Sequence, residues 1–146
     1  MKIVLPFIAV FLLISCNKQD QLTRTEKRLL GKWFYTNVDF KPLWGIKKDI
    51  TSDYFGQTLS FENNFFMSLE NTQTNELFEG VWQVNEQLVT NNQNGTINQQ
   101  VIASYAHPTT GEITQLVWDS FTVYRNKIVA NYSTKDGSYS LELKKF

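Results

Sequence analysis

The sequence has little of the chemistry on which disulfides and metal sites depend, with one cysteine and one histidine among its 146 residues. A single cysteine excludes a disulfide within the chain, and a single histidine leaves His107 without a second imidazole for a metal site. No glycine-rich phosphate loop or metal-ligand spacing is present. A catalytic nucleophile would also need a base that a third group orients. These absences predict a protein that is not an enzyme and holds no cofactor, with His107 exposed in a turn-like stretch before Pro108.

An excess of charge of one sign is also lacking. The 14 lysine and arginine residues balance 14 aspartate and glutamate residues. A nearly neutral domain has no electrostatic footprint for nucleic acid, so we expect no nucleic-acid partner.

Aromatic residues, in contrast, are abundant. The chain has 11 Phe, six Tyr and four Trp, and 42% of its residues are hydrophobic. Flat side chains fit the pleated, half-buried surface of a sheet, so this composition favours β-structure. The length corresponds to one ordinary domain. Without a disulfide, its hydrophobic core must provide the stability.

The first sixteen residues form a distinct segment. Lys2 precedes an unbroken apolar run, which ends at Ser15 and Cys16. A charged start, a short apolar core and a small residue before the cut are typical of an export signal, and the apolar core is short for a membrane span. The segment Leu13-Ile14-Ser15-Cys16 resembles the lipobox of bacterial lipoproteins.

This resemblance implies a signal peptide at residues 1–15 and a lipidated cysteine with a short tether at residues 16–21. Acyl chains such as palmitate on Cys16 would anchor the protein, since several chains on one residue hold a protein stably on a membrane. Asn17 is not the aspartate that keeps enterobacterial lipoproteins at the inner membrane. The resemblance therefore implies the outer membrane of a Gram-negative cell envelope. Removal of Lys2 with the signal would leave a mature charge close to minus one.

A short helix is predicted after the tether. Thr23 and Glu26 have the spacing of a capping box, in which a hydroxyl precedes a carboxylate by three residues. The helix should run to Leu29 and Leu30, with Gly31 as its left-handed C-terminal cap.

From Trp33 onward, apolar and polar residues alternate with a period of two, as in antiparallel strands with one buried face. The apolar positions include Leu59 and Phe61; Phe65, Met67 and Leu69; Phe78, Gly80, Trp82 and Val84; and Tyr139, Leu141 and Leu143. Turn-forming pairs fall between these runs at Asn63-Asn64, Asn85-Glu86, Asn94-Gly95, Arg125-Asn126 and Asp136-Gly137. The pattern predicts a meander of about eight or nine short strands.

Two regions are less regular. Residues 87–100 are rich in Asn, Gln and Thr and have little apolar pattern to define a register, so we expect a hairpin that projects from the body or is mobile. Residues 41–53 are too long for a tight hairpin. We expect them to form a long loop with a helical turn over one end of the sheet, where function is more often found than in strands.

A meander of this size either closes into a barrel or folds into two facing sheets. Short up-and-down connections favour an antiparallel up-and-down barrel, because closure removes exposed edges. Such a barrel is either filled by side chains or holds one small ligand. The inward positions are mostly bulky, which predicts a small or absent cavity. Glu62, Glu70, Glu79 and Glu142 fall at outward positions; a carboxylate pair across the barrel mouth could do acid and base work, but the sequence does not place one.

The motifs resemble those of a known family. Leu30-Gly31-Lys32-Trp33 is similar to the Gly-x-Trp that opens the first strand of lipocalins and of lipocalin-like domains in bacterial lipoproteins. The runs 59–66 and 78–84 are similar to the repeating pattern of such domains, in which a strand-turn-strand pair precedes a Gly-x-Trp strand. The resemblance covers residues 22–146. It implies a lipocalin-like barrel that holds a small hydrophobic molecule.

The four tryptophans divide into two groups. Trp33, Trp82 and Trp118 alternate with polar neighbours and should lie in the core, with Trp33 closing one end of the barrel. Trp44 lies in the long loop, where an exposed aromatic side chain is a candidate contact for a ligand or partner. Two functions stay open: an anchored barrel that binds a small apolar ligand, or a protein-interaction lipoprotein such as an inhibitor, an immunity factor or an accessory subunit of an envelope complex.

Overall fold

The computed structural model describes residues 22–91 and 94–146. The predicted export signal, the lipidated Cys16 and the tether therefore lie outside the described residues. Within the described part, no helix is long and apolar enough to cross a membrane.

Helix α1 (Arg24–Leu29) begins as the sequence predicts. The Thr23 hydroxyl accepts a hydrogen bond from the Glu26 backbone N–H at 3.2 Å, and the Glu26 carboxylate accepts one from the Thr23 N–H at 2.7 Å. This capping box satisfies two N–H groups that a helix start leaves unpaired. Gly31 follows with a φ of +117°, a conformation that favours glycine, and it is already the first residue of the sheet.

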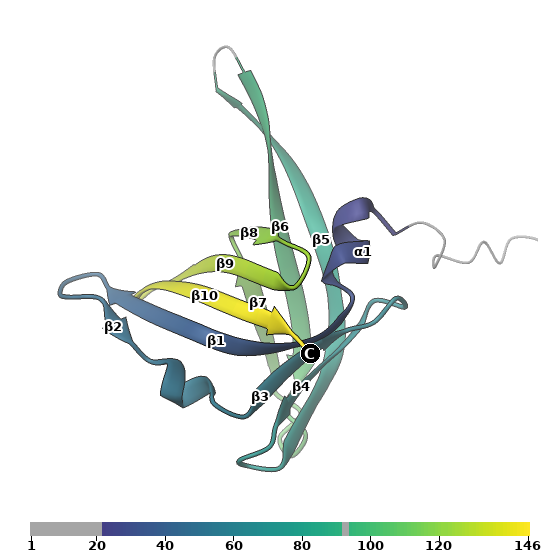
Figure 1. Ribbon diagram of the computed structural model, residues 1–146, viewed down its shortest axis with the longest axis vertical. Coiled ribbons are helices and arrows are strands. Elements are labelled where there is room, and N and C mark those ends of the chain that lie inside the picture. The colour runs from purple at the N-terminus through teal and green to yellow at the C-terminus, as the bar shows by residue number, and fades with distance from the viewer. Residues whose placement is uncertain (1–21, 92–93) are drawn as a thin grey trace, which may run out of the picture.

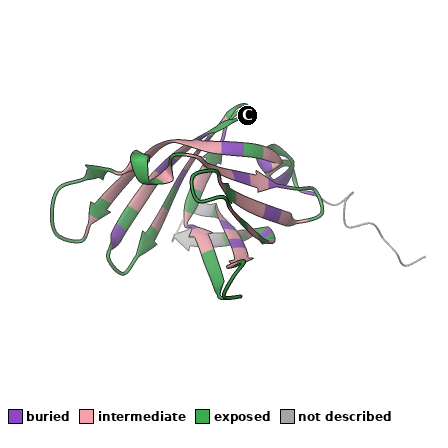
Figure 2. Ribbon diagram, turned by 90° about the horizontal axis from the view of Figure 1, so that it is seen from below, coloured by how far each residue is buried: buried purple, intermediate pink, exposed green. Residues whose placement is uncertain are grey.

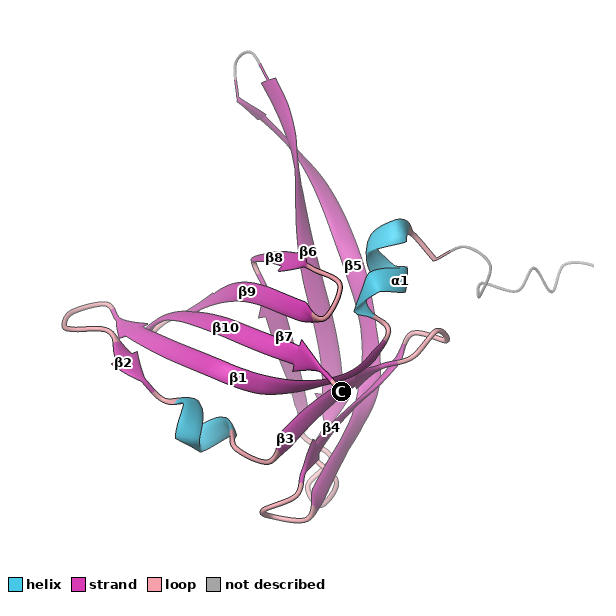
Figure 3. Cartoon of the chain, viewed as in Figure 1, coloured by secondary structure: helices cyan, strands magenta, loops and turns pink. Residues whose placement is uncertain are grey.

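The rest of the chain is almost entirely strand (Figure 3). The strands are β1 (Gly31–Pro42), β2 (Lys48–Asp49), β3 (Gln57–Phe61), β4 (Phe66–Asn71), β5 (Glu76–Asn91), β6 (Asn94–Ala106), β7 (Ile113–Trp118), β8 (Ser120–Val123), β9 (Lys127–Thr134) and β10 (Gly137–Lys145), with a 3-10 turn η3 (Thr51–Tyr54). Nine strands form one antiparallel order, β7-β6-β5-β4-β3-β1-β10-β9-β8, and β2 pairs with β1 alone. The predicted all-β, antiparallel up-and-down barrel preceded by a short helix is confirmed.

The barrel is nearly closed by one bent segment. The two ends of the strand order, β7 and β8, follow each other in the chain and are separated by Asp119 alone. Before Asp119 the segment pairs with β6, and after it the segment pairs with β9. The Asp119 carboxylate accepts a hydrogen bond from the Ser133 backbone N–H at 2.8 Å. A side chain thus takes the place of a strand carbonyl at the point where the segment changes partner.

The strands on the two sides of this bend run in different directions. In Figure 1, β5 and β6 run steeply, whereas β1, β9 and β10 run across the picture toward the β1–β2 hairpin. The two groups meet where α1 covers one end of the barrel. At the opposite end they diverge, and the barrel is widest there.

The core fills the end beside the helix. Trp33, Trp82 and Trp118 are each at most 2% exposed, as predicted, and Phe61 contacts the rings of both Trp82 and Trp118. Figure 2 shows the buried positions along the strands and the exposed positions in the loops and hairpin ends. Trp33 donates its indole N–H to the Leu29 carbonyl of α1 at 2.7 Å, so it joins the helix to the barrel end that it closes. The Trp118 indole nitrogen, in contrast, is buried without a hydrogen-bond partner.

The region around the second hairpin differs from the prediction. Asn85 and Glu86 form no turn, because β5 continues through them and pairs with β6 as far as Asn91. Asn94 and Gly95 belong to β6, where they pair with Asn91 and Thr90. These polar residues are of types that are common in turns, but here they lie within strands. Both strands are therefore longer than the short strands that the sequence predicts. The resulting hairpin projects far beyond the barrel body, one of the two predicted behaviours (Figure 1).

Candidate functional site

Five of the six tyrosines gather at the wide end of the barrel. They are Tyr35 on β1, Tyr54 on η3, Tyr105 on β6, Tyr132 on β9 and Tyr139 on β10, and we call them the tyrosine cluster. All five pack against the core, yet each stays half-buried. The sheet therefore brings aromatic side chains from distant parts of the sequence to one partly open surface.

Four of the five tyrosines contact one another in a chain, and the ring of Tyr105 contacts Phe78 instead. Tyr35 and Tyr54 have ring centroids 5.0 Å apart, and the hydroxyls of Tyr54 and Tyr132 lie 3.4 Å apart. Tyr132 stacks on Tyr139 with centroids 4.4 Å apart and an interplanar angle of 2°. Phe40 continues the chain beside Tyr139, with centroids 4.7 Å apart. Aromatic faces and hydroxyls thus alternate along this surface.

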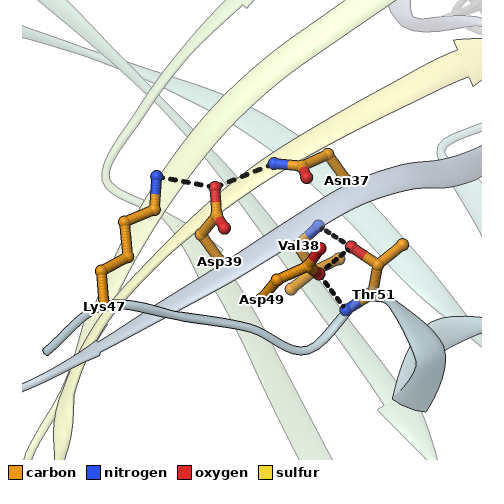
Figure 4. A network of polar contacts seen from close by, with 6 residues as sticks. All are labelled: Asn37, Val38, Asp39, Lys47, Asp49 and Thr51. Atoms are coloured by element: carbon orange, nitrogen blue, oxygen red, sulfur yellow. Dashed lines mark hydrogen bonds and ion pairs between the residues drawn. The ribbon is translucent and has the colours of Figure 1, made fainter.

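Tyr54 owes its position to the loop after β1, and Figure 4 shows the polar contacts that hold this loop. The Thr51 hydroxyl accepts a hydrogen bond from the Val38 N–H and donates one to the Asp49 carboxylate, at 2.9 Å and 2.6 Å. Lys47 forms an ion pair with Asp39 at 2.8 Å. These contacts fasten the loop along β1 where β3 has already ended its pairing, so η3 places Tyr54 between Tyr35 and Tyr132. The long loop with a helical turn predicted at residues 41–53 is therefore present, with the short strand β2 in addition.

The same contacts lower the pKa of two carboxyls in the loop. Lys47, followed by the Asn37 amide, lowers the pKa of Asp39 because both donate hydrogen bonds to its ionised form. The hydroxyl and backbone N–H of Thr51 lower the pKa of Asp49 in the same way. Both carboxylates are thus ionised at neutral pH. Their charge strengthens the contacts with Lys47 and Thr51 that hold the loop and position Tyr54.

Four of the five phenols in the tyrosine cluster have a raised pKa. Burial raises the pKa of Tyr35 and of Tyr132 above the usual value for a phenol, and the neighbouring phenol of Tyr54 adds to both shifts. Burial also raises the pKa of Tyr105 and Tyr139. At neutral pH the surface offers uncharged rings and hydroxyl groups that can donate or accept hydrogen bonds. Its chemistry suits an uncharged, largely apolar molecule with a few polar atoms.

Small residues lie next to the cluster. Ala103 and Ala130 occupy inward positions two residues before Tyr105 and Tyr132, and both are fully buried. Gly80 pairs with Tyr105 across β5 and β6. Leu59, Met67 and Leu141 belong to the core against which the cluster packs, and each is at most 1% exposed. The interior of the barrel is filled at the helix end, and only small side chains lie next to the cluster. A ligand at the cluster would therefore occupy a shallow site and not a deep cavity.

The residues singled out in the sequence are not brought to one site. Cys16 lies outside the described residues. Trp44 lies in the turn between β1 and β2, where it is 93% exposed, and the adjacent Leu43 and Ile46 are 68% and 85% exposed. The β1–β2 hairpin thus presents an apolar tip beside the wide end of the barrel. Trp44 itself contacts no ring of the cluster among the aromatic pairs of the described residues.

His107 lies in the predicted turn, between β6 and β7, but it is half-buried rather than exposed. Its Nδ1 atom accepts hydrogen bonds from the Thr109 and Thr110 N–H groups at 3.2 Å and 3.4 Å, and its ring contacts Phe78 with centroids 5.4 Å apart. These contacts give it a structural role in the turn. Within the described ranges, no group of three or more His, Cys, Asp or Glu residues is placed to hold a metal ion.

The carboxylates lie on the outer surface, as their strand positions predict. Glu62 and Glu70 line a hollow of about 500 Å³ on the outer face of β3 and β4, together with Ser60 and Ser68. Glu142 forms an ion pair with Lys127 at 2.9 Å. A second hollow, of about 620 Å³, lies between α1 and β5. Neither of these two hollows is lined by a residue of the tyrosine cluster.

The sequence contained only a partial signal for the cluster. Tyr139 falls on the inward side of an alternating run, and Tyr132 and Tyr105 stand two residues after the buried Ala130 and Ala103. Alternation shows that these tyrosines face inward. It does not show that they share one end of the barrel, because that depends on the register and direction of every strand between them.

The fold and the cluster define the class of the protein: an antiparallel β-barrel with a filled helix end and a tyrosine-lined wide end. Comparison of the chain with models of known families, with curated proteins and with solved structures gives no match.

Proposed function

We propose that this chain is a lipid-anchored envelope protein whose lipocalin-like barrel binds a small hydrophobic ligand at the tyrosine cluster. The observation that carries the proposal is the gathering of five half-buried tyrosines, from five elements, at the wide end. A half-buried ring contributes less to the stability of the folded protein than a fully buried one, because part of its apolar surface stays in contact with water. A ligand that covers these rings removes the remaining apolar surface from water, and the free energy of that burial favours binding. The proposed activity is binding without catalysis.

The nature of the surface narrows the ligand class. The raised pKa of Tyr35 and Tyr132 means that these phenols stay neutral in contact with an apolar molecule. Their rings supply flat apolar area, and the paired hydroxyls of Tyr54 and Tyr132 supply donors and acceptors. An uncharged molecule with an apolar body and one or two polar atoms matches both features.

Binding can be tested with the neutral dye N-phenyl-1-naphthylamine, whose fluorescence rises in apolar sites. We expect Tyr54→Ala to weaken dye binding about tenfold, because one aromatic contact contributes about 1 kcal/mol or somewhat more. Tyr54 is suited to this test because it lies on η3, outside the strand ladders. The matched control is Tyr124→Ala, since Tyr124 is exposed in the β8–β9 turn away from the cluster. Equal affinities for these two variants, or no dye binding by the parent chain, would contradict the proposal.

The membrane anchor is a separate part of the proposal and has its own test. Cells that express the full chain are labelled with a clickable palmitate analogue and then fractionated. We expect the wild type to carry the label and to sediment with membranes, and Cys16→Ala to lose both, because the only thiol of the chain is removed. An unlabelled wild type, or equal labelling of the variant, would exclude lipidation of Cys16.

A second function is favoured by a different observation, the apolar tip of the β1–β2 hairpin. Leu43, Trp44 and Ile46 are all at least 68% exposed on one turn. Exposed aromatic and aliphatic side chains in such a group mark surfaces that a protein partner covers. In this alternative the chain is a protein-interaction lipoprotein, and Trp44→Ala would abolish partner capture and leave dye binding at the cluster unchanged.

A further inference from the structure

The edge strand β7 has features that natural edge strands usually avoid. β7 is one end of the strand order and pairs only with β6. Its sequence, Ile-Thr-Gln-Leu-Val-Trp, has no charged residue, no proline and no glycine. Edge strands are normally protected by charges, proline, bulges or short length, because their free N–H and C=O groups can pair with another chain.

The ladder shows which backbone groups of β7 are free. The His107 N–H donates to the Glu112 carbonyl at 2.8 Å, so these residues form a hydrogen-bonded pair at the start of the β6–β7 ladder. Hydrogen-bonded and non-hydrogen-bonded pairs alternate along an antiparallel ladder. The next hydrogen-bonded pairs with β6 therefore involve Thr114, Leu116 and Trp118. Ile113, Gln115 and Val117 consequently direct their N–H and C=O groups away from β6, toward an edge with which no strand of this chain pairs, although β9 contacts β7 where the barrel nearly closes.

The side chains of the same three residues lie on the outer face of the barrel. Trp118 and Leu116 belong to the core, so the alternating positions 117, 115 and 113 face outward. Ile113 is 74% exposed, and Val81, on the same outer face two strands away, is 58% exposed. The free edge is therefore bordered by an apolar surface without an adjacent charge on β7.

The two shortest edges of the sheet, β2 and β8, are protected. β2 has only two residues, and both, Lys48 and Asp49, are charged. β8 has four residues and is followed by Tyr124 and Arg125 in a tight turn. On the β9 side of the bend, the Ser133 N–H is already occupied by the Asp119 carboxylate. β7 is the uncharged six-residue edge of the barrel body. On the projecting hairpin, residues 94–100 of β6 are also uncharged and pair only with β5, but they include a glycine and are mostly polar.

The β7 edge is complementary to itself. When two antiparallel copies are centred on Gln115, each Gln115 faces its symmetry mate, and Ile113 of one copy faces Val117 of the other. All three free N–H groups and all three free C=O groups on each strand then find partners. Both cross-strand apolar pairs fall on the same outer face. A charged strand could not pair with itself in this way without bringing like charges together.

From this register we propose that two copies of the chain associate through β7, so that the sheets of the two barrels become continuous across a two-fold axis. Such an axis produces the isologous interface that is most frequent in symmetric dimers. The inference does not depend on the ligand proposed above, because β7 contributes no tyrosine to the cluster.

Cross-linking tests the register directly. The full chain with Cys16→Ser and Gln115→Cys carries one thiol, and in the proposed dimer the two Cα atoms at position 115 would lie about 5.5 Å apart, within reach of a disulfide. Oxidation with copper phenanthroline should give at least tenfold more covalent dimer than the control with Val81→Cys, an exposed position on the outer face of β5 that has strands paired on both sides. Equal yields for the two variants would overturn the proposal.

Proline gives an independent test by sedimentation, in the Cys16→Ser background. Gln115→Pro removes two intermolecular hydrogen bonds per dimer and no bond to β6, so the dimer dissociation constant should rise about a hundredfold. Thr114→Pro, which removes a bond to β6, is the control that should lower the melting temperature. If Gln115→Pro does not fold, Gln115→Lys should separate the copies by charge repulsion. A monomeric parent chain, or a folded Gln115→Pro or Gln115→Lys variant that associates like the parent, would overturn the proposal.

Discussion

Replacing Gly80 with alanine is expected to destabilise the barrel by about 3 kcal/mol or more, a large part of the stability of a domain of this size. A Cβ atom at this position would lie 2.6 Å from the Tyr105 Cα atom and collide with the Ser104 carbonyl oxygen. Both atoms belong to the backbone of β6, which pairs with β5 on one side and β7 on the other. The strand cannot move away without breaking ladder hydrogen bonds, so the collision cannot relax as it would against a flexible side chain.

The control for this prediction is Gly111→Ala. Gly111 has a φ of +70°, and a Cβ atom there would have nothing within 4 Å. This variant therefore measures only the cost of a left-handed alanine, about 1 kcal/mol. Urea unfolding of both variants can be followed by tryptophan fluorescence, because three of the four tryptophans are buried. Equal losses of unfolding free energy for Gly80→Ala and Gly111→Ala would contradict this prediction. They would mean that β6 can move away from β5 and that the close backbone approach at Gly80 does not affect stability.

Local patterns in the sequence were sufficient to predict the barrel. The capping box at Thr23 and Glu26, the alternating runs at residues 59–61 and 139–143, and the turn at Asp136 each depend on residues close in sequence. Because each pattern determines which face of a strand is buried, the core positions of Trp33, Trp82 and Trp118 follow from it.

The errors occurred at polar residues, two of them in a strand and one in a turn. Asn85 and Glu86 have turn chemistry, yet they continue β5, because pairing with β6 extends the ladder through them. Local propensity was overridden there by cross-strand hydrogen bonding. His107 was predicted to be exposed, but its ring accepts two backbone hydrogen bonds and contacts Phe78. Neither contact can be found without the path of the turn.

The tyrosine cluster and the β7 edge required long-range information. Tyr35 and Tyr132 belong to strands that are separated by β10 in the sheet and by almost a hundred residues in the chain. The free groups of β7 result from the bend at Asp119, where the chain leaves β6 for β9. Both sites are therefore consequences of register and closure, which alternation alone does not specify.

The barrel is expected to lose stability steeply in alkaline solution, because its tyrosines must stay protonated. Burial raises the pKa of Tyr35 in the folded state, and the phenols of Tyr54 and Tyr105 add to the shift. A phenol whose pKa is higher in the folded than in the unfolded chain contributes its full stability below the unfolded pKa, about 10. That contribution is lost as the pH rises above this value, because only the unfolded chain then releases the proton. Tyr35 alone should cost about 1.4 kcal/mol for each pH unit above about 10.

The raised pKa of Tyr132, with the smaller rises of Tyr105 and Tyr139, should steepen this loss. The measurement is the free energy of unfolding in urea between about pH 9 and pH 11, together with phenolate absorbance. We expect the phenolates of Tyr35, Tyr105, Tyr132 and Tyr139 to appear with unfolding, in one cooperative step. Tyr35→Phe serves as the control, because it keeps the ring contact with Tyr54 but removes one titrating group, so its stability should fall less steeply with pH. All other ionisable groups are the same in both chains, so the comparison with Tyr35→Phe isolates the contribution of the Tyr35 phenol. Identical slopes for the two chains would mean that the Tyr35 phenol is open to solvent, and the wide end of the barrel would then offer water-filled space instead of a neutral aromatic surface.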